Sequence, residues 1–265
     1  MKITDLKVWL TRPAGRTWVF LQIDTDEGIS GVGEASSPGG GGSILVGRTI
    51  RLLKEASYTG EFRDTLIGEN PMDIDRLWHK VYRRFTALGS RGLPTAVVSG
   101  IDIALWDIKG KALGRPVYDI LGGKFRDKVL LYTHVNPSKG PKAAADHAKR
   151  LVAEGYTALK TDPFSEEMGP QHRRYTTGTI SPQGEEKAEE IIAAIREAVG
   201  PKVEILIDAH GNFNVPTAVR LMNRLSKYNL TWFEEPCQPE SFDALQQVRQ
   251  QTDVPISVGE RLYTR

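Results

Sequence analysis

Hydrophobic and polar residues alternate along the start of the chain. Residues 2–10 and 17–24 follow this alternation, and the turn TDEG (25–28) leads into GISGVGEA (28–35), which predicts a third strand. A period of two places every second side chain on one face of a sheet. The sequence therefore predicts an antiparallel meander at the beginning of the chain.

Helical patterns follow this predicted meander. They cover residues 44–57 and 72–85, and the apolar segment 94–123 predicts a long helix that ends near Gly114 and Pro116, with a shorter helix after it. The stretch SSPGGGGSI (36–44) is too rich in glycine for regular structure. Residues 1–125 are thus predicted to form an α+β domain.

The rest of the chain alternates short apolar runs with helical stretches. Strands are predicted at 129–135, 156–160, 204–208, 230–234 and 255–259, and helices at 141–154, 184–199, 215–228 and 240–250. Regular βα alternation favours a parallel sheet, either open or closed into a barrel. We expect an α+β domain at 1–125, followed by an α/β barrel domain of TIM type at 126–265 with five βα strands. These units lack G-x-G-x-x-G and P-loop patterns, which argues against nucleotide binding.

Composition narrows the classes of protein. The 265 residues carry a net charge of +2, too small to suggest nucleic-acid binding. Apolar runs stay below the roughly 18 residues that a membrane span needs, and the start MKITDLKVWL lacks a signal-peptide core. A single cysteine, Cys237, excludes an intrachain disulfide framework. We expect a cytoplasmic protein with neither a membrane nor a nucleic acid as partner.

Polar side chains end four of the five predicted barrel strands. They are Lys160 and Asp162, then Asp208 and His210, then Glu234 and Glu235, and finally Glu260. The carboxyl ends of parallel strands meet on one face of a barrel, where active sites lie. Asp208, Glu234 and Glu260 are spaced evenly, 26 residues apart. Three carboxylates with open positions suit Mg²⁺, so we predict a magnesium site there, with Asp208, Glu234 and Glu260 as the metal ligands.

Several motifs resemble one known family. D-x-H at 208–210, EEP at 234–236 and GER at 259–261 resemble the metal-ligand set of the enolase superfamily. The segment 99–123 resembles the characteristic helix of its mandelate racemase subgroup. Within that subgroup, D-x-H followed by GERLYTR is most similar to galactonate dehydratase and related acid-sugar dehydratases.

This resemblance implies a chemistry. A small-molecule sugar acid would bind Mg²⁺ through its carboxylate and lose the adjacent proton to form an enediolate that the metal stabilises, and the 3-hydroxyl would then leave. His210 would be the catalytic general acid and Lys160 would lie near the substrate carboxylate. Because relatives are commonly oligomeric, we also expect a homo-oligomer.

Three further residues are candidates for substrate binding: Asp162, Arg84 and Arg174. Many relatives have Lys-x-Lys where this chain has Lys160-Thr161-Asp162, so a second lysine is not available as a base. The loop SPGGGG (37–42) is a candidate lid over the barrel mouth.

Only five barrel strands are predicted, and this number leaves functions other than dehydration open. The family's barrel has eight strands, and its usual His–Asp base dyad lies on the sixth and seventh, so we expect a truncated chain. The first alternative is a racemase, epimerase or cycloisomerase of a related carboxylate, which shares the enediolate. The second is a non-catalytic remnant that keeps a metal-binding face.

Overall fold

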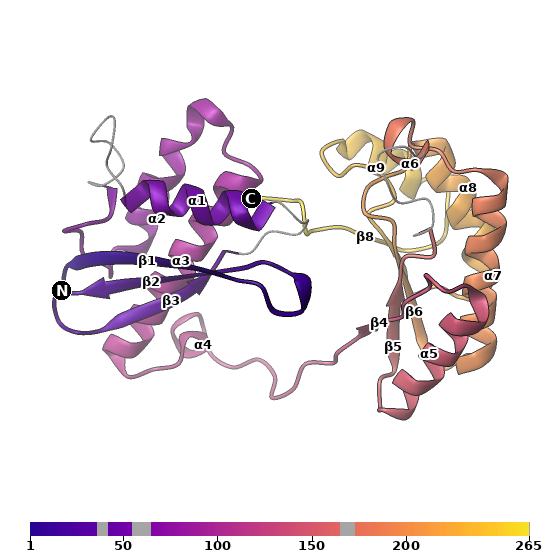
Figure 1. Ribbon diagram of the computed structural model, residues 1–265, viewed down its shortest axis with the longest axis horizontal. Helices are drawn as coiled ribbons and strands as arrows, with labels where there is room; N and C mark the ends of the chain where they lie inside the picture. The colour runs from indigo at the N-terminus through magenta and orange to yellow at the C-terminus, as the bar shows by residue number, and fades with distance from the viewer. Residues whose placement is uncertain (36–41, 55–64, 165–172, 265) are drawn as a thin grey trace. The chain divides into compact units, whose positions relative to one another are not determined.

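The computed structural model describes residues 1–35, 42–54, 65–164 and 173–264 (Figure 1). The proposed lid loop falls largely on residues 36–41, and much of the loop after the second barrel strand falls on 165–172; both lie outside the described residues. The chain divides into two compact units, Met1–Asp127 and Lys128–Thr264. We describe each unit by itself.

The first unit is built on the antiparallel meander that the alternation predicts. Its strands are β1 (Ile3–Thr11), β2 (Trp18–Thr25) and β3 (Ser30–Glu34), in the order β1-β2-β3. Its helices are α1 (Gly42–Lys54), α2 (Ile74–Arg84), α3 (Leu93–Leu113) and α4 (Val117–Ile120), with short 3₁₀ turns at Pro13–Gly15 and Thr86–Leu88. Gly114 takes the left-handed conformation (φ 62°) that commonly ends a helix, which terminates α3 as expected.

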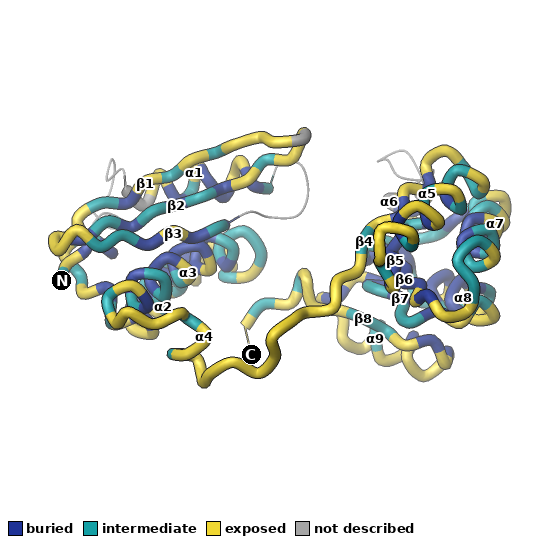
Figure 2. The backbone as a smooth tube through the Cα atoms, turned by 90° about the horizontal axis from the view of Figure 1, so that it is seen from below, coloured by how far each residue is buried: buried dark blue, intermediate teal, exposed yellow. Residues whose placement is uncertain are grey.

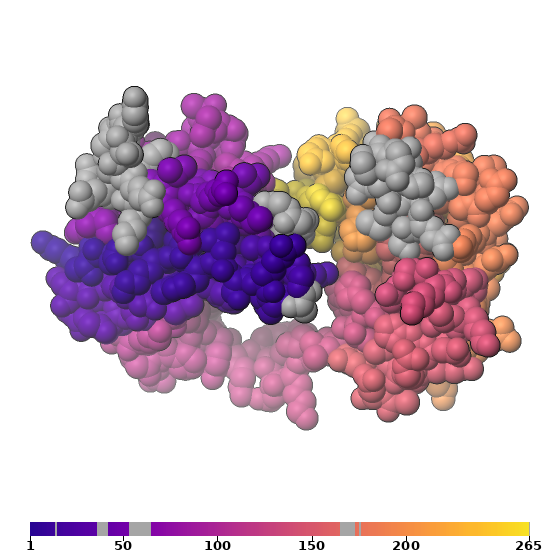
Figure 3. Space-filling view, in the orientation of Figure 1, coloured from indigo at the N-terminus to yellow at the C-terminus, as the bar shows by residue number. Residues whose placement is uncertain are grey.

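One face of this sheet carries the core of the unit. Val19, Leu21 and Ile23 on β2 are fully buried, and they belong to one apolar cluster with residues of α1, α2 and α3 (Figure 2). The opposite face is open. Trp9, Trp18 and Val32 are between 37% and 46% exposed, and Figure 3 shows the indigo residues of β1 and β2 at the molecular surface.

Two glycines allow the long helix to lie against the sheet. A Cβ atom at Gly31 would lie 2.1 Å from the carbonyl oxygen of Ala104, and one at Gly33 would lie 2.0 Å from that of Gly100. Both obstacles are backbone atoms of α3, which cannot rotate away as a side chain can. The close packing of β3 on α3 therefore requires glycine at these two positions.

Replacing Gly33 with alanine is expected to destabilise the first unit by about 3 kcal/mol, because α3 must move away from the sheet to admit a methyl group. The midpoint of denaturant unfolding, followed by tryptophan fluorescence, measures the effect. Val32→Ala on the same strand points to the open face and is the matched control, with an expected change below about 1 kcal/mol. Equal midpoints for the two variants would contradict this packing.

The second unit is a five-stranded parallel sheet with helical connections. Its strands are β4 (Thr133–His134), β5 (Ala158–Thr161), β6 (Glu204–Asp208), β7 (Trp232–Glu234) and β8 (Ile256–Ser257), side by side in chain order. The helices are α5 (Pro141–Ala153), α6 (Arg173–Thr176), α7 (Pro182–Val199), α8 (Val215–Leu225) and α9 (Phe242–Arg249), and a 3₁₀ turn at Ser226–Tyr228 follows α8. An N-terminal α+β unit and a barrel-like parallel sheet confirm the predicted fold class.

Local sequence explains where these helices begin. Ser181, Asn214 and Ser241 cap α7, α8 and α9 by accepting a backbone N–H three residues further on, at 3.0, 3.0 and 3.3 Å. The strands are buried on both sides, as parallel strands under helices are: all four residues of β5 and four of the five in β6 are buried. Leu159, Ile205, Ile207 and Phe233 share one core with apolar residues of α5, α7 and α8.

The first barrel strand is shorter than predicted. The run 129–135 predicts seven strand residues, but β4 contains only Thr133 and His134, and residues 121–132 are exposed. β4 lies at the edge of the sheet and pairs only with β5, at Thr133–Leu159 and His134–Lys160. Because Thr133 already pairs with Leu159, the second residue of β5, Val129, Leu130 and Leu131 precede the start of β5 and take no part in the ladder.

An ion-pair network joins α7 to α8. Glu189 accepts from Nε of Arg224 at 2.5 Å and from the hydroxyl of Tyr228 at 3.2 Å, and it also pairs with Lys227. The hydrogen bond from Lys227, followed by that from Arg224, lowers the pKa of the Glu189 carboxyl to about 2. The ionised form of Glu189 is thus favoured in the folded state.

Glu189→Gln is expected to lower the free energy of unfolding by about 0.5–1 kcal/mol at neutral pH. A carboxyl whose pKa is lower in the folded than in the unfolded protein stabilises the fold above its unfolded pKa. That contribution is lost as the pH falls toward 2, so the difference between wild type and variant should shrink over this range. Urea unfolding at several pH values tests this, with Glu190→Gln on the exposed side of α7 as control. A difference that stays constant with pH would contradict the account.

Within the described part of the chain, none of the helices is both long and apolar enough to span a bilayer.

Candidate active site

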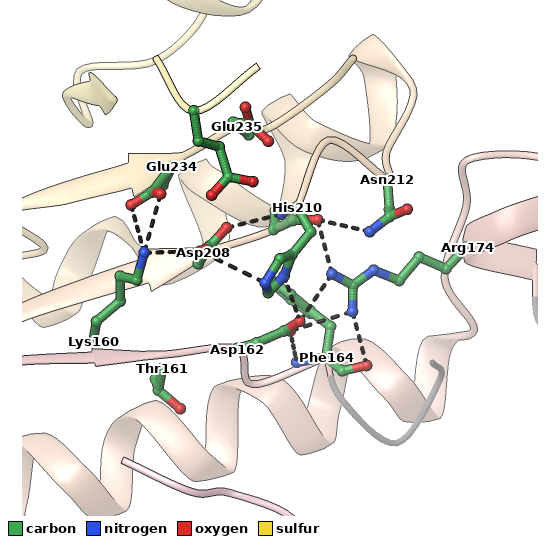
Figure 4. A network of polar contacts seen from close by, with 12 residues as sticks. Lys160, Thr161, Asp162, Phe164, Arg174, Asp208, His210, Asn212, Glu234 and Glu235 are labelled. Carbon is green, nitrogen blue, oxygen red and sulfur yellow. Dashed lines mark hydrogen bonds and ion pairs between the residues drawn. The ribbon is translucent and has the colours of Figure 1, made fainter. Parts of the chain in front are cut away.

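The carboxyl ends of three neighbouring strands, β6, β7 and β8, meet at one edge of the parallel sheet. Asp208, the last residue of β6, pairs in register with Glu234, the last residue of β7, and Glu234 pairs with Ser257 on β8. Pairing continues past the strands, because Ala209 N–H donates to Glu234 O and Gly211 N–H donates to Glu235 O, at 2.9 and 2.8 Å. The polar residues that follow the strands are therefore held on a continuous backbone ladder (Figure 4).

Lys160 lies between two of the predicted metal ligands. Its Nζ atom is 2.9 Å from Oδ2 of Asp208 and 3.0 Å from both carboxylate oxygens of Glu234. Burial alone lowers the pKa of this ammonium, but its hydrogen bonds to Asp208 and Glu234 outweigh burial and raise it. The side chains of Lys160 and Asp208 are each 6% exposed, so this is a buried, charged cluster.

The aromatic rings around Lys160 limit how it can move. Its Nζ atom lies 5.5 Å from the ring centroid of Tyr132, and the Tyr132 ring makes an edge contact with Trp232. The indole N–H of Trp232 donates to Oε2 of Glu234 at 3.2 Å. These contacts fix the Glu234 carboxylate from one side while Lys160 fixes it from the other.

A second group contains the predicted general acid. Nδ1 of His210 lies 3.0 Å from Oδ2 of Asp162, and Nε2 lies 3.6 Å from Oδ2 of Asp208. The hydrogen bond to Asp162 raises the pKa of His210. Burial raises the pKa of Asp162, but the His210 hydrogen bond and the Arg174 charge overcome that effect and lower it. The His210 side chain is 37% exposed and the Asp162 side chain 10%, so the imidazole is the part of the pair that solvent reaches.

The backbone brings His210 into this position. His210 has a φ of 55°, in the left-handed region, and Gly211 after it has a φ of 67°. Histidine occupies this region more readily than most residues. Its backbone N–H donates to Oδ1 of Asp208 at 3.0 Å, so this carboxylate also fixes the turn that carries the imidazole.

A third group follows β7 and β8. Arg261 pairs with the fully buried Glu235 and, at 3.0 Å, with Glu260. Burial raises the pKa of the Glu260 carboxyl, and the nearby negative charges of Asp208 and Glu234 raise it further. Glu260 therefore lies close enough to those two carboxylates to be repelled by them, as a third ligand of one cation would be.

The charges of the cluster suit a divalent cation. Four carboxylates face only two positively charged side chains, while Asp162 and Arg174 neutralise one another. The carboxylates are Asp208, Glu234, Glu235 and Glu260, and the cations are Lys160 and Arg261. With His210 neutral, the described residues of this cluster lack two positive charges, which is the charge of one Mg²⁺ ion.

The oxygen-only donor set also fits magnesium. In the described part of the chain, however, no three acidic, histidine or cysteine side chains form a ready ligand group. The Lys160 ammonium lies between Asp208 and Glu234 instead. We conclude that Asp208, Glu234 and Glu260 have the chemistry to hold Mg²⁺ once Lys160 no longer bridges the first two.

The structure brings together most of the residues that the sequence singles out. One network of hydrogen bonds and ion pairs contains Lys160, Asp162, Arg174, Asp208, His210 and Glu234, and Glu260 lies beside it. Arg84 ends α2 in the other unit and stays a prediction. Arg174 is fully buried against Asp162, so substrate contact by either residue also stays a prediction.

Sequence reasoning missed Arg261 as the partner of Glu235, although the GER motif contains it. It also missed Phe164 and Phe213, whose rings contact one another and lie near the Arg174 guanidinium, with centroids 5.6 and 5.2 Å from Cζ. No periodic pattern in a loop could have indicated these two contacts.

Comparison with known proteins agrees with this geometry. Residues 6–122 match the model of the mandelate racemase / muconate lactonizing enzyme N-terminal domain, and residues 143–265 match the enolase C-terminal domain-like model. The chain is 35% identical over 268 residues to D-xylonate dehydratase of Haloferax volcanii, covering 100% of this chain and 61% of that protein. It is 36% identical to D-galactonate dehydratase of Variovorax paradoxus, covering 100% of this chain and 63% of that protein.

A solved structure shows the same fold over the same region. It is a member of the enolase superfamily from Salmonella Typhimurium, 31% identical, with a TM-score of 0.88 over 100% of this chain and 68% of that one. The chain spans somewhat less than two thirds of the length of the two curated relatives. By its two domain matches and by the arrangement of its strand-end carboxylates, the chain belongs to the mandelate racemase / muconate lactonizing enzyme family of the enolase superfamily.

Proposed function

We propose that this protein is a Mg²⁺-dependent dehydratase of a sugar acid, a hydro-lyase that removes the α-proton and the 3-hydroxyl of an aldonate. The observation that carries the proposal is the group of strand-end side chains in which Lys160, Asp208, Glu234 and His210 converge, with Glu260 beside them. The two relatives, a xylonate and a galactonate dehydratase, support the substrate class.

In this proposal Asp208, Glu234 and Glu260 hold the metal. Bound Mg²⁺ supplies positive charge that stabilises the negative charge developing on the substrate carboxylate when the α-proton leaves. Lys160 adds a second positive charge at the same place. Because it already pairs with carboxylates at 2.9–3.0 Å, its ammonium is suited to donate a hydrogen bond to the substrate carboxylate.

His210 serves the departure of the hydroxyl. A hydroxyl is a poor leaving group unless it receives a proton, and imidazole can supply one near neutral pH. Asp162 binds Nδ1 of His210, so Nε2 is the nitrogen left for the substrate. The exposed fraction of His210, 37%, allows a substrate to reach it.

The proposal extends to the setting of the protein. We expect a small-molecule sugar acid as the only partner of the reaction, a cytoplasmic location, and a homo-oligomeric state. A native mass measurement of the purified protein tests the last of these.

A screen of sugar acids tests the activity. The protein is incubated with galactonate, gluconate or xylonate, with Mg²⁺ or with EDTA, in D₂O. Dehydration produces a 2-keto-3-deoxy acid that has lost one water, detected as its semicarbazone and by mass. A racemase or epimerase would instead incorporate deuterium with no loss of water. A protein that binds Mg²⁺ and produces neither result with any acid would favour the non-catalytic alternative.

A further inference from the structure

Arg174 is a fully buried charged side chain near the site, as Glu235 is. None of its side chain is exposed, and it makes four hydrogen bonds. Nη1 donates to Asp162 Oδ1 and Phe164 O, both at 3.2 Å, and Nη2 donates to Asp162 Oδ2 at 3.0 Å and to Ala209 O at 2.8 Å. The guanidinium therefore forms a two-pronged pair with Asp162 and binds two backbone carbonyls (Figure 4).

Those two carbonyls belong to the loops that carry the site. Phe164 lies in the segment after β5, two residues past Asp162, and Ala209 lies between Asp208 and His210 after β6. One side chain thus ties both loops together. The rings of Phe164 and Phe213 pack edge-to-face on one another, with centroids 5.0 Å apart, and both lie within cation–π distance of the guanidinium.

Asp162 is held so that its oxygens can only accept hydrogen bonds. Oδ1 accepts from Phe164 N–H at 2.9 Å and from Arg174 Nη1, and Oδ2 accepts from Arg174 Nη2 and faces Nδ1 of His210 at 3.0 Å. The Oδ2 oxygen of Asp162 in this setting requires a hydrogen-bond donor, so Nδ1 of His210 must carry a proton. A neutral His210 must then carry its proton on Nδ1, which leaves the Nε2 lone pair facing the site.

Burying an ion pair is a poor way to stabilise a fold, since apolar side chains of similar volume often serve as well or better. A buried pair does fix orientation. Through Arg174, the Asp162 carboxylate is tied to both the loop after β5 and the turn after β6. The arrangement is suited to setting the direction of the imidazole.

We propose that Arg174 is a positioning residue that acts through Asp162: it fixes the Asp162 carboxylate so that His210 is held with Nδ1 protonated and Nε2 directed into the site. The catalytic consequence of this geometry rests on the proposed dehydratase function. The geometric part does not, because it concerns only the resting protein. The inference gives Arg174 a different role from the substrate contact that the sequence suggests.

The test is the tautomer of His210, read from its side-chain ¹⁵N chemical shifts. Spectra are recorded without metal or substrate, in alkaline buffer where the imidazole is neutral. The protein has five histidines, and a His210→Gln variant assigns the resonance. Wild type is expected to show one tautomer, protonated at Nδ1. Arg174→Met is expected to show the tautomer mixture of a free imidazole, and Arg174→Lys an intermediate spectrum, because lysine keeps the charge but not the fork.

Arg173 provides the matched control. It precedes Arg174 on α6 and is exposed, so Arg173→Met should leave the His210 spectrum unchanged. If the single variant fails to fold, a double variant, Asp162→Asn with Arg174→Met, takes its place. It removes both charges together and leaves no lone buried charge. It too should lose the single Nδ1–H tautomer. A folded Arg174→Met or double variant with the wild-type spectrum would overturn the proposal.

Kinetics separate a positioning role from substrate contact. Arg174→Met is expected to lower kcat about 10- to 100-fold with KM nearly unchanged, as for other supporting residues behind a reactive group. A raised KM with kcat unchanged would instead place Arg174 on the substrate and overturn the proposal. If wild type shows the single tautomer but dehydrates no sugar acid, the proposed function fails while the positioning role stands.

Discussion

Replacing Asp208 with asparagine is expected to weaken Mg²⁺ binding at least 100-fold and to lower dehydratase kcat by roughly a thousandfold or more. An amide removes one of three negative ligands, and the metal contributes several kcal/mol of transition-state stabilisation. Each 1.36 kcal/mol corresponds to about a tenfold change in rate. Titration calorimetry with Mg²⁺ and keto-acid formation measure the two effects.

Glu240→Gln is the control for this substitution. Glu240 is exposed in the segment that follows β7, close in sequence to the ligands but outside the cluster. Its replacement should change neither Mg²⁺ affinity nor turnover. If Asp208→Asn bound Mg²⁺ as tightly as wild type, the ligand assignment would be wrong in every version of the proposed function.

Lys160→Met is expected to destabilise the metal-free protein by about 3–5 kcal/mol, the usual effect of removing one partner of a buried ion pair. Without the ammonium, Asp208 and Glu234 remain adjacent, buried and unneutralised. Mg²⁺ supplies the missing charge, so it should stabilise the variant by more than it stabilises wild type. Thermal unfolding with EDTA and with saturating Mg²⁺ measures the difference between the two proteins.

Lys202→Met serves as the comparison, since Lys202 is an exposed lysine that precedes β6 at the opposite end of the strand. It should stay within about 0.5 kcal/mol of wild type in both buffers. If Lys160→Met unfolded in EDTA at the same temperature as wild type, the buried carboxylates would not need the Lys160 ammonium. The charge argument for the metal would then fail.

The sequence predicted the parts of the site that depend on strand periodicity. Short apolar strands between helices place Asp208 and Glu234 at one edge of a parallel sheet, and the structure confirms their pairing. The same reasoning located Lys160 and His210. The positions were predicted correctly because the local sequence pattern indicates in which direction each strand runs and how the helical connections join the strands.

The parts that the sequence could not predict depend on loop paths and pairing partners. Arg174 follows a polar stretch without periodicity, and nothing in its sequence neighbours indicates that two phenylalanine rings contact it. The run 129–135 has the composition of a strand, but its register places residues 129–131 before the start of β5, where no partner strand is present. The pairing of Glu235 with Arg261 likewise joins two strand ends whose side-chain directions the pattern left open.

The most direct test of the central claim is to locate a bound divalent cation. Crystals of the protein soaked in Mn²⁺, which has the ligand preferences of Mg²⁺ and a usable anomalous signal, would show its position. The account predicts one strong peak within bonding distance of Asp208, Glu234 and Glu260, with Lys160 no longer bridging the first two. A peak elsewhere, or a Lys160 bridge that persists at saturating Mn²⁺ with no peak between the three carboxylates, would contradict it.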